Sequence, residues 1–129
     1  MGERQIRSVC LVALLALSVP AVANASGDGE AKHRGSCSGG PGKWRLTVHP
    51  VTESKMRIRF AIDGGKPGER WQLFLSIDGD RIFTDTKRAD ERGDVHAIER
   101  AADKPGSHRI EAAGVNVDSG GSCQGSIRY

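Results

Sequence analysis

Residues 55–62 read Lys-Met-Arg-Ile-Arg-Phe-Ala-Ile, in which every second residue is a large apolar one. Side chains of a β-strand point alternately to the two faces of a sheet, so this stretch has one apolar face and one polar face. Such a strand is half-buried, as in an antiparallel sheet with one solvated side. Residues 43–49 (Lys-Trp-Arg-Leu-Thr-Val-His) and 70–77 (Arg-Trp-Gln-Leu-Phe-Leu-Ser-Ile) repeat the pattern. The three stretches indicate an all-β fold.

Turn residues separate these strands from one another and from four more. Pro50 is expected to end the first strand, and Asp78-Gly79 predicts a two-residue hairpin turn after the third. Gly114 is expected to mark a bulge in the sixth strand. Seven short antiparallel strands with regular turn signals predict a two-sheet sandwich. The last four strands are expected over residues 81–86, 95–100, 108–117 and 122–129.

The first 25 residues have the three parts of an export signal. Two arginines lie near the start, residues 9–19 are apolar, and Ala23 and Ala25 provide the small residues of a cleavage site. The apolar run is shorter than the roughly 20 residues that a membrane-spanning helix needs. An uncleaved anchor and a buried core helix are the alternatives. We expect a secreted, extracellular protein without a transmembrane anchor after signal cleavage.

Signal cleavage after residue 25 would leave 104 of the 129 residues, enough for one domain. Residues 26–42 are rich in Gly and Ser and predict a flexible leader, followed by the sandwich domain over residues 43–129. Loss of two arginines and one glutamate lowers the net charge from +3 to +2. A net charge of +2 is too small to support a strong electrostatic claim from composition alone.

The mature chain would keep two cysteines, Cys37 and Cys123, because Cys10 lies in the signal. An even pair in an exported protein predicts a disulfide. It would close a loop of about 87 residues, for which chain entropy gives an upper figure of about 4.5 kcal/mol of stabilisation. A metal or nucleophilic pair is the rival interpretation, but no His or second Cys lies at ligand spacing. We expect no metal and no cofactor.

Several residues resemble those of immunoglobulin-like and fibronectin III-like sandwiches. Trp71 opens the third strand as a core tryptophan does, and residues 103–110 resemble the corner before the sixth strand. His108 stands there in place of a tyrosine and Ile110 in place of a cysteine. Residues 37–129 also resemble small exported domains of high-GC Gram-positive bacteria, with a Cys-Ser-Gly-Gly start and a late cysteine. The resemblance implies a fold and no activity.

The sequence lacks the usual catalytic signatures. It contains no Gly-x-Ser-x-Gly, no His-Glu-x-x-His and no glycine-rich phosphate loop. Four histidines could serve as bases, but His33 lies in the leader, His108 is expected to pack at a corner, and His49 and His96 lie in or beside strands. We therefore expect no enzyme.

A first candidate surface lies on the hairpin around Asp78-Gly79. Counting back from a two-residue turn places Phe74 opposite Phe83, with both rings pointing away from the core. Arg70 and Arg81 would flank them, as at a protein-binding patch. The alternative is an aromatic pair that only stabilises the hairpin or is covered by the leader.

A second candidate surface is a basic stripe on the outward faces of the first, second and fifth strands, which share one sheet in an immunoglobulin-like sandwich. Adjacent cations on one face attract polyanions, here wall polymers, anionic lipid head groups or stray nucleic acid. The alternative is a solvated face balanced by Glu53 and Glu99. The stripe consists of Arg45, Lys55, Arg57, Arg59 and Arg100.

We therefore expect a secreted binding or interaction module whose partner is a protein or an anionic polymer of the cell envelope. Nothing indicates specific nucleic-acid recognition. The alternative is a secreted inhibitor that inserts residues 63–68 or 87–94 into the cleft of an extracellular enzyme. A carbohydrate-binding domain would need exposed aromatic side chains, and most of the few here are expected to point inward.

Overall fold

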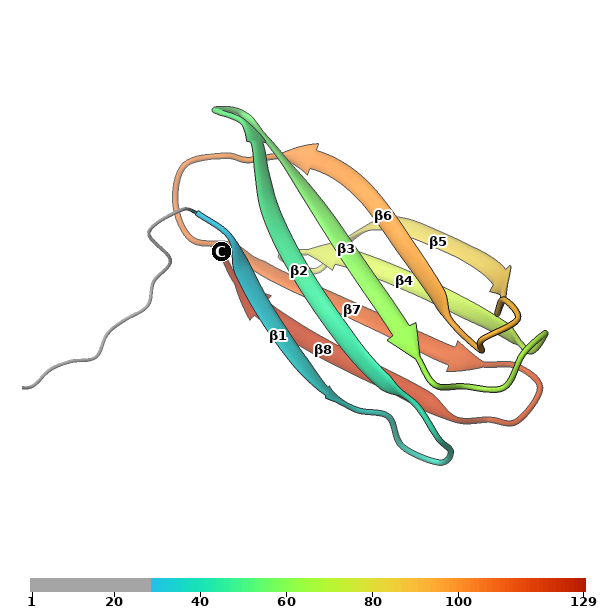
Figure 1. Cartoon of the computed structure of the whole chain (residues 1–129). Coiled ribbons are helices and arrows are strands. Elements are labelled where there is room, and N and C mark those ends of the chain that lie inside the picture. The colour runs from blue at the N-terminus through green and yellow to red at the C-terminus, as the bar shows by residue number, and fades with distance from the viewer. Residues whose placement is uncertain (1–28) are drawn as a thin grey trace, which may run out of the picture.

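A computed structural model describes residues 29–129 and shows an all-β sandwich of two antiparallel sheets (Figure 1). The first sheet has the order β1-β2-β3-β6 and the second the order β5-β4-β7-β8. The predicted fold class is confirmed, whereas the predicted signal peptide, residues 1–25, lies outside the described residues. The strands are β1 (Ala31–Ser36), β2 (Lys43–Thr52), β3 (Lys55–Asp63), β4 (Arg70–Ile77), β5 (Asp80–Arg88), β6 (Val95–Ala102), β7 (Arg109–Asn116) and β8 (Ser122–Arg128).

Strands β2–β8 are the seven that the sequence predicts, and β2, β3 and β6 share one sheet as expected. Asp78 and Gly79 both have positive φ, 50° and 88°, as a two-residue type I′ turn requires. Pro50 does not end β2, which continues to Thr52 with a register irregularity after the proline. Residues 29–129 contain no helix, and hence none long and apolar enough to cross a membrane.

Gly114 does not mark a bulge, because the pairing of β7 with β4 and β8 runs through it without a shift. It is needed for a close approach between the sheets. A Cβ at this position would lie 2.6 Å from Cδ1 of Ile62 and 3.1 Å from Cδ2 of Leu73. The glycine therefore leaves room for Ile62 of the facing sheet and for Leu73 of the neighbouring strand β4.

The predicted flexible leader contains a strand. β1 pairs with β2 from Ala31, opposite Val48, to Ser36, opposite Lys43. This strand has no large apolar side chain of its own, so the sequence pattern does not reveal it. It is defined by its pairing with β2 and by the cysteine that follows it.

Trp44 joins β1 to the second sheet. Its ring fills the space above two glycines, Gly35 of β1 and Gly125 of β8, and a Cβ on either would overlap the ring. His33 of β1 meets the indole edge to face at 5.4 Å between ring centroids. His33 Nδ1 also lies 2.9 Å from the carbonyl oxygen of Ser126 in β8. These contacts close one side of the sandwich.

The disulfide between Cys37 and Cys123 is confirmed and ties the end of β1 to β8. Beside it, the backbones of Ser38 and Ser122 exchange hydrogen bonds of 2.7 and 2.8 Å. The core between the sheets is apolar, and its largest fully buried side chains are Trp71, Phe60, Leu46, Met56, Ile58, Ile62, Leu73, Leu75 and Ile110.

His108 holds the corner before β7. Its Nδ1 lies 2.7 Å from Asp78 Oδ2 and its Nε2 lies 2.9 Å from the carbonyl oxygen of Lys104. Both partners are acceptors, so only the imidazolium, with two N–H groups, satisfies both. The Asp78 contact first, and then the Lys104 carbonyl, raise the pKa of His108. The pKa of Asp78 is lowered, chiefly by the backbone N–H of Arg109 and next by His108.

This corner predicts a pH dependence of stability. The raised pKa of His108 means that its contribution is fully present below about pH 6.5, the ordinary histidine pKa, and is lost as the pH rises through the folded-state pKa. The lowered pKa of Asp78 keeps its contribution constant over that range, because it is lost only under acidic conditions. Urea unfolding should show stability falling as the pH rises above about 6.5 in the wild type and falling less in His108→Gln. The exposed His96 offers the control His96→Gln, and an equal fall in both variants would contradict the assignment.

Candidate functional site

The predicted aromatic patch is divided between the two faces of the second sheet. Phe74 lies opposite Thr84, whereas Phe83 lies opposite Leu75. Because Leu75 is fully buried, Phe83 is on the core side of the sheet and packs against the core. Only Phe74, half-buried, points to the outer face. The prediction that Phe74 and Phe83 lie opposite each other on the outer face is therefore wrong.

The cause is a β-bulge in β5. Ser76 pairs with Arg81 but Leu75 pairs with Phe83, which leaves Ile82 as an extra residue. One extra residue moves every later side chain of the strand to the opposite face. Counting from the turn cannot detect such a residue, because the apolar character of Ile82 and Phe83 fits either face.

The two arginines of this patch already have partners. Arg70 Nη2 lies 2.8 Å from Oδ1 of Asp118, and its backbone N–H donates to Oδ2 of the same carboxylate. This pairing raises the pKa of Arg70 and lowers that of Asp118. The guanidinium of Arg81 lies over the ring of Phe74, with its carbon 4.4 Å from the centroid. Arg70 begins β4, whereas Arg81 of β5 pairs with Ser76 near the other end of β4, so the two arginines do not form one surface.

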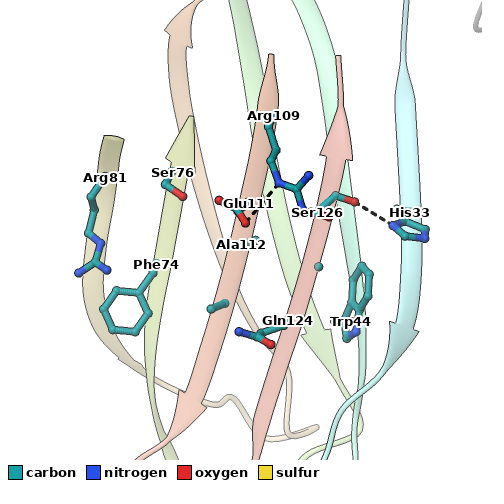
Figure 2. A pocket seen from close by; sticks show the side chains of 12 residues that line it. His33, Trp44, Phe74, Ser76, Arg81, Arg109, Glu111, Ala112, Gln124 and Ser126 are labelled. Carbon is teal, nitrogen blue, oxygen red and sulfur yellow. Dashed lines mark hydrogen bonds and ion pairs between the residues drawn. The ribbon is translucent and has the colours of Figure 1, made fainter. Parts of the chain in front are cut away.

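A shallow hollow of about 520 Å³ lies on the outer face of β4, β7 and β8 (Figure 2). Phe74 and Arg81 stand on one side of it and His33 and Trp44 on the other. Its polar groups are largely engaged with one another, since Arg109 Nε lies 3.5 Å from Glu111 Oε2 and His33 contacts the Ser126 carbonyl. The hollow therefore offers few free groups for recognition. Its lining is completed by Ser76, Ala112, Ala113, Gln124 and Gly125.

The predicted basic stripe lies on one continuous surface, the outer face of the first sheet. The inward side chains Leu46, Ile58 and Phe60 are fully buried. The pleat of a strand therefore turns the residues between them outward. The residues on this face are Arg45 from β2, Lys55, Arg57 and Arg59 from β3, and Arg100 from β6.

Strand β1 extends this surface with two cations that were expected in a leader. Arg34 pairs with Arg45, and Lys32 pairs with Thr47, so both share the outer face of β2. We call the surface the basic face. Its cations are Lys32, Arg34, Lys43, Arg45, Lys55, Arg57, Arg59 and Arg100.

On the basic face, two pairs of arginines stand directly opposite each other across neighbouring strands. Arg57 of β3 faces Arg100 of β6, and Arg34 of β1 faces Arg45 of β2. Like charges opposed in this way destabilise a sheet. Arg45 Nη1 lies 3.8 Å from Asp63 Oδ2, whereas the other three pair with no carboxylate of residues 29–129. The repulsion is therefore left largely uncompensated within the fold.

The acids near this face are not the ones that the sequence indicated. Glu53 lies in the turn after β2, and Glu99 lies opposite the buried Ile58, on the inward side of β6. Glu30 is the acid beside β1, with its oxygens 3.5 Å from Lys32 Nζ and 3.1 Å from His49 Nδ1. The basic face keeps a large excess of cations, although the predicted mature chain carries only +2.

A depression of about 310 Å³ lies within the basic face, across β1, β2 and β3. Three arginines, Arg45, Arg57 and Arg59, line it. Arginine presents a planar fork of N–H donors that suits phosphate and carboxylate oxygens. The depression can therefore hold an anionic group between several cations. Its remaining lining consists of Glu30, Lys32, Thr47 and His49.

No group of three or more His, Cys, Asp or Glu side chains within residues 29–129 is arranged to hold a metal ion. Among the histidines, His33, His49 and His108 contact a carbonyl or carboxylate oxygen of the fold. Within residues 29–129 the basic face is therefore the most distinctive chemical feature.

Comparisons with known proteins suggest no function, so function has to be argued from the residues of this chain. No family model, no curated protein and no solved structure matches it. The resemblance to exported domains of Gram-positive bacteria therefore stays a prediction.

We expect Arg100 to lower the stability of the fold, because it stands opposite Arg57. Replacing Arg100 by glutamine should raise the free energy of unfolding by about 0.2–1 kcal/mol at low ionic strength, because it removes the repulsion with Arg57. At about 1 M salt, where the Debye length is roughly 3 Å, the gain should disappear. Urea unfolding at both ionic strengths measures it, with Lys104→Gln in the exposed β6–β7 loop as the control, since Lys104 has no cross-strand partner. A loss of stability in Arg100→Gln at low salt would contradict the interpretation of this pair.

Proposed function

We propose that the protein is a secreted binding module that holds an anionic polymer of the cell envelope on its basic face. The observation that carries the proposal is the pair of opposed arginines Arg57 and Arg100, extended by Arg34 and Arg45. A ligand that binds only the folded state and neutralises these charges stabilises that state by linkage.

The spacing of the cations favours a polymer over a single ion. Neighbouring strands lie about 4.8 Å apart, and side chains on one face of a strand recur about every 6.8 Å. Arg57 and Arg59 repeat along β3, while Arg45 and Arg100 extend the array to β2 and β6. Anionic groups repeating at about 5–7 Å would meet several cations at once, which multiplies weak contacts.

Secretion is part of the proposal and rests on two features. The first 25 residues have the pattern of an export signal. The disulfide between Cys37 and Cys123 fits an oxidising compartment outside the cytosol.

An inhibitor of an extracellular enzyme is the second candidate, and one observation favours it. The loops over residues 63–68 and 87–94 hold each other, with the Gly65 N–H donating to the Gly93 carbonyl at 3.1 Å. Asp90 Oδ1 accepts from two backbone N–H groups of its own loop, at 2.9 Å each. Loops fixed in this way lose little entropy on binding.

A defined polyanion tests the proposal. The double variant Arg57→Gln/Arg59→Gln should bind inorganic polyphosphate about tenfold more weakly at low salt, because it loses two charge-assisted contacts. The slope of log affinity against log salt concentration should become shallower by about two. Isothermal titration calorimetry over a salt series measures both quantities.

The matched control is Lys104→Gln/Arg128→Gln, which removes the same charge outside the basic face. It should keep nearly the wild-type affinity and slope. Equal losses in both double variants would show attraction by net charge alone and would refute a site on the basic face. An inhibitor that acts through residues 63–68 or 87–94 would be unaffected by either double variant.

A further inference from the structure

One buried polar group of the core has no partner. Trp71 is 2% exposed, and its Nε1 is the buried side-chain atom of the described residues that lacks a hydrogen bond. An unpaired N–H inside a protein destabilises the fold and calls for an explanation, such as a bound water or a ligand. The basic face does not involve this group.

Trp71 lines a cavity of about 260 Å³ at the end of the sandwich where β1, β3 and β7 finish (Figure 1). Residues 38–41, next to the disulfide, form one wall, and Gly65 of the β3–β4 loop forms another. A Cβ on Gly65 would lie 3.9 Å from Trp71 Nε1, so the indole N–H edge lies beside the lining of the cavity. The volume is below that of a pocket for a drug-sized ligand and suits a single residue.

A hydrogen-bond acceptor lies in the same lining. Glu69 precedes Trp71 by two residues, and its Oε1 accepts from Asn116 Nδ2 at 2.9 Å. Asn116 is the cross-strand partner of Trp71, which places the three side chains together. Oε2 of Glu69 has no partner among the residues that the structure describes, so this carboxylate can accept a further hydrogen bond.

A cation completes the lining. Lys66 borders the cavity, is exposed, and pairs with no carboxylate of residues 29–129. The cavity therefore offers an N–H donor in Trp71, a carboxylate acceptor in Glu69 and an ammonium group in Lys66. A secondary amide carries one acceptor and one donor, and a neighbouring carboxylate would match the ammonium.

We propose that this cavity binds the C-terminal residue of a peptide. The carbonyl of the last peptide bond accepts a hydrogen bond from Trp71 Nε1, and its N–H donates to Glu69 Oε2. The terminal carboxylate pairs with Lys66. Gly39, Gly40 and Gly65 carry no side chains, which leaves space in the cavity beside the indole for the residue of the peptide.

The test uses N-acetylalanine as probe and the indole N–H signals of Trp44 and Trp71 in a nitrogen–proton correlation spectrum as readout. Trp71→Phe assigns the signals by removing one of them. The Trp71 signal should move downfield saturably and its exchange with solvent should slow, while the Trp44 signal stays in place. N-acetylalanine methyl ester, which lacks the carboxylate, should bind about tenfold more weakly.

Two variants separate binding from folding. Lys66→Ala should lower the affinity about tenfold, and Glu69→Gln should lower it while keeping an oxygen for Asn116 to contact. Arg57→Gln/Arg59→Gln should bind N-acetylalanine as the wild type does, since the basic face lies elsewhere. A Trp71 signal that exchanges slowly and does not move at saturating probe would mean a bound water only and would overturn the proposal. Equal affinity for the acid and its methyl ester would overturn the role of Lys66.

Discussion

The register between β2 and β3 fixes both faces of the first sheet at once. Leu46 lies opposite Phe60 and Val48 opposite Ile58, and all four are fully buried. Because successive side chains of a strand alternate, the same register places Arg45, Arg57 and Arg59 on the solvent side. The burial of the core and the crowding of cations on the opposite side therefore have the same cause, the register between β2 and β3. A shift of one residue would exchange the two sets and bury the arginines, so the alternating pattern excludes such a shift.

Strand β1 connects this sheet to the rest of the molecule. Its inward side supplies Gly35 and His33 to the Trp44 ring, and its outward side supplies Lys32 and Arg34 to the basic face. The disulfide at its end holds it against β8. Loss of this covalent link would weaken both the closure of the sandwich and the completeness of the charged surface. The same link borders the cavity beside Trp71, so one end of β1 shapes both proposed sites.

The sequence predicts the parts of this fold whose apolar pattern is strong. The alternation in β2, β3 and β4 identifies the strands, and a positive φ at Asp78 and Gly79 matches the predicted hairpin. The sequence does not reveal β1, because the strand has no alternating apolar side chains and is held by its pairing with β2 and by the contacts of His33. It also does not reveal the bulge at Ile82, which places Phe83 against the core. The orphan N–H of Trp71 depends on tertiary packing, which no local pattern encodes. By contrast, the outward direction of Arg45, Arg57 and Arg59 follows from period two alone.

Co-sedimentation of the protein with cell-envelope fractions of the producing organism, over a series of salt concentrations, tests the central claim most directly. If the basic face holds an anionic polymer, the pelleted fraction should be high when the Debye length exceeds the spacing of the cations and should fall steeply as salt shortens it. Pelleting that does not depend on salt would contradict the account, since it would require contacts other than those of the arginines. Failure to pellet at low salt would contradict it as well.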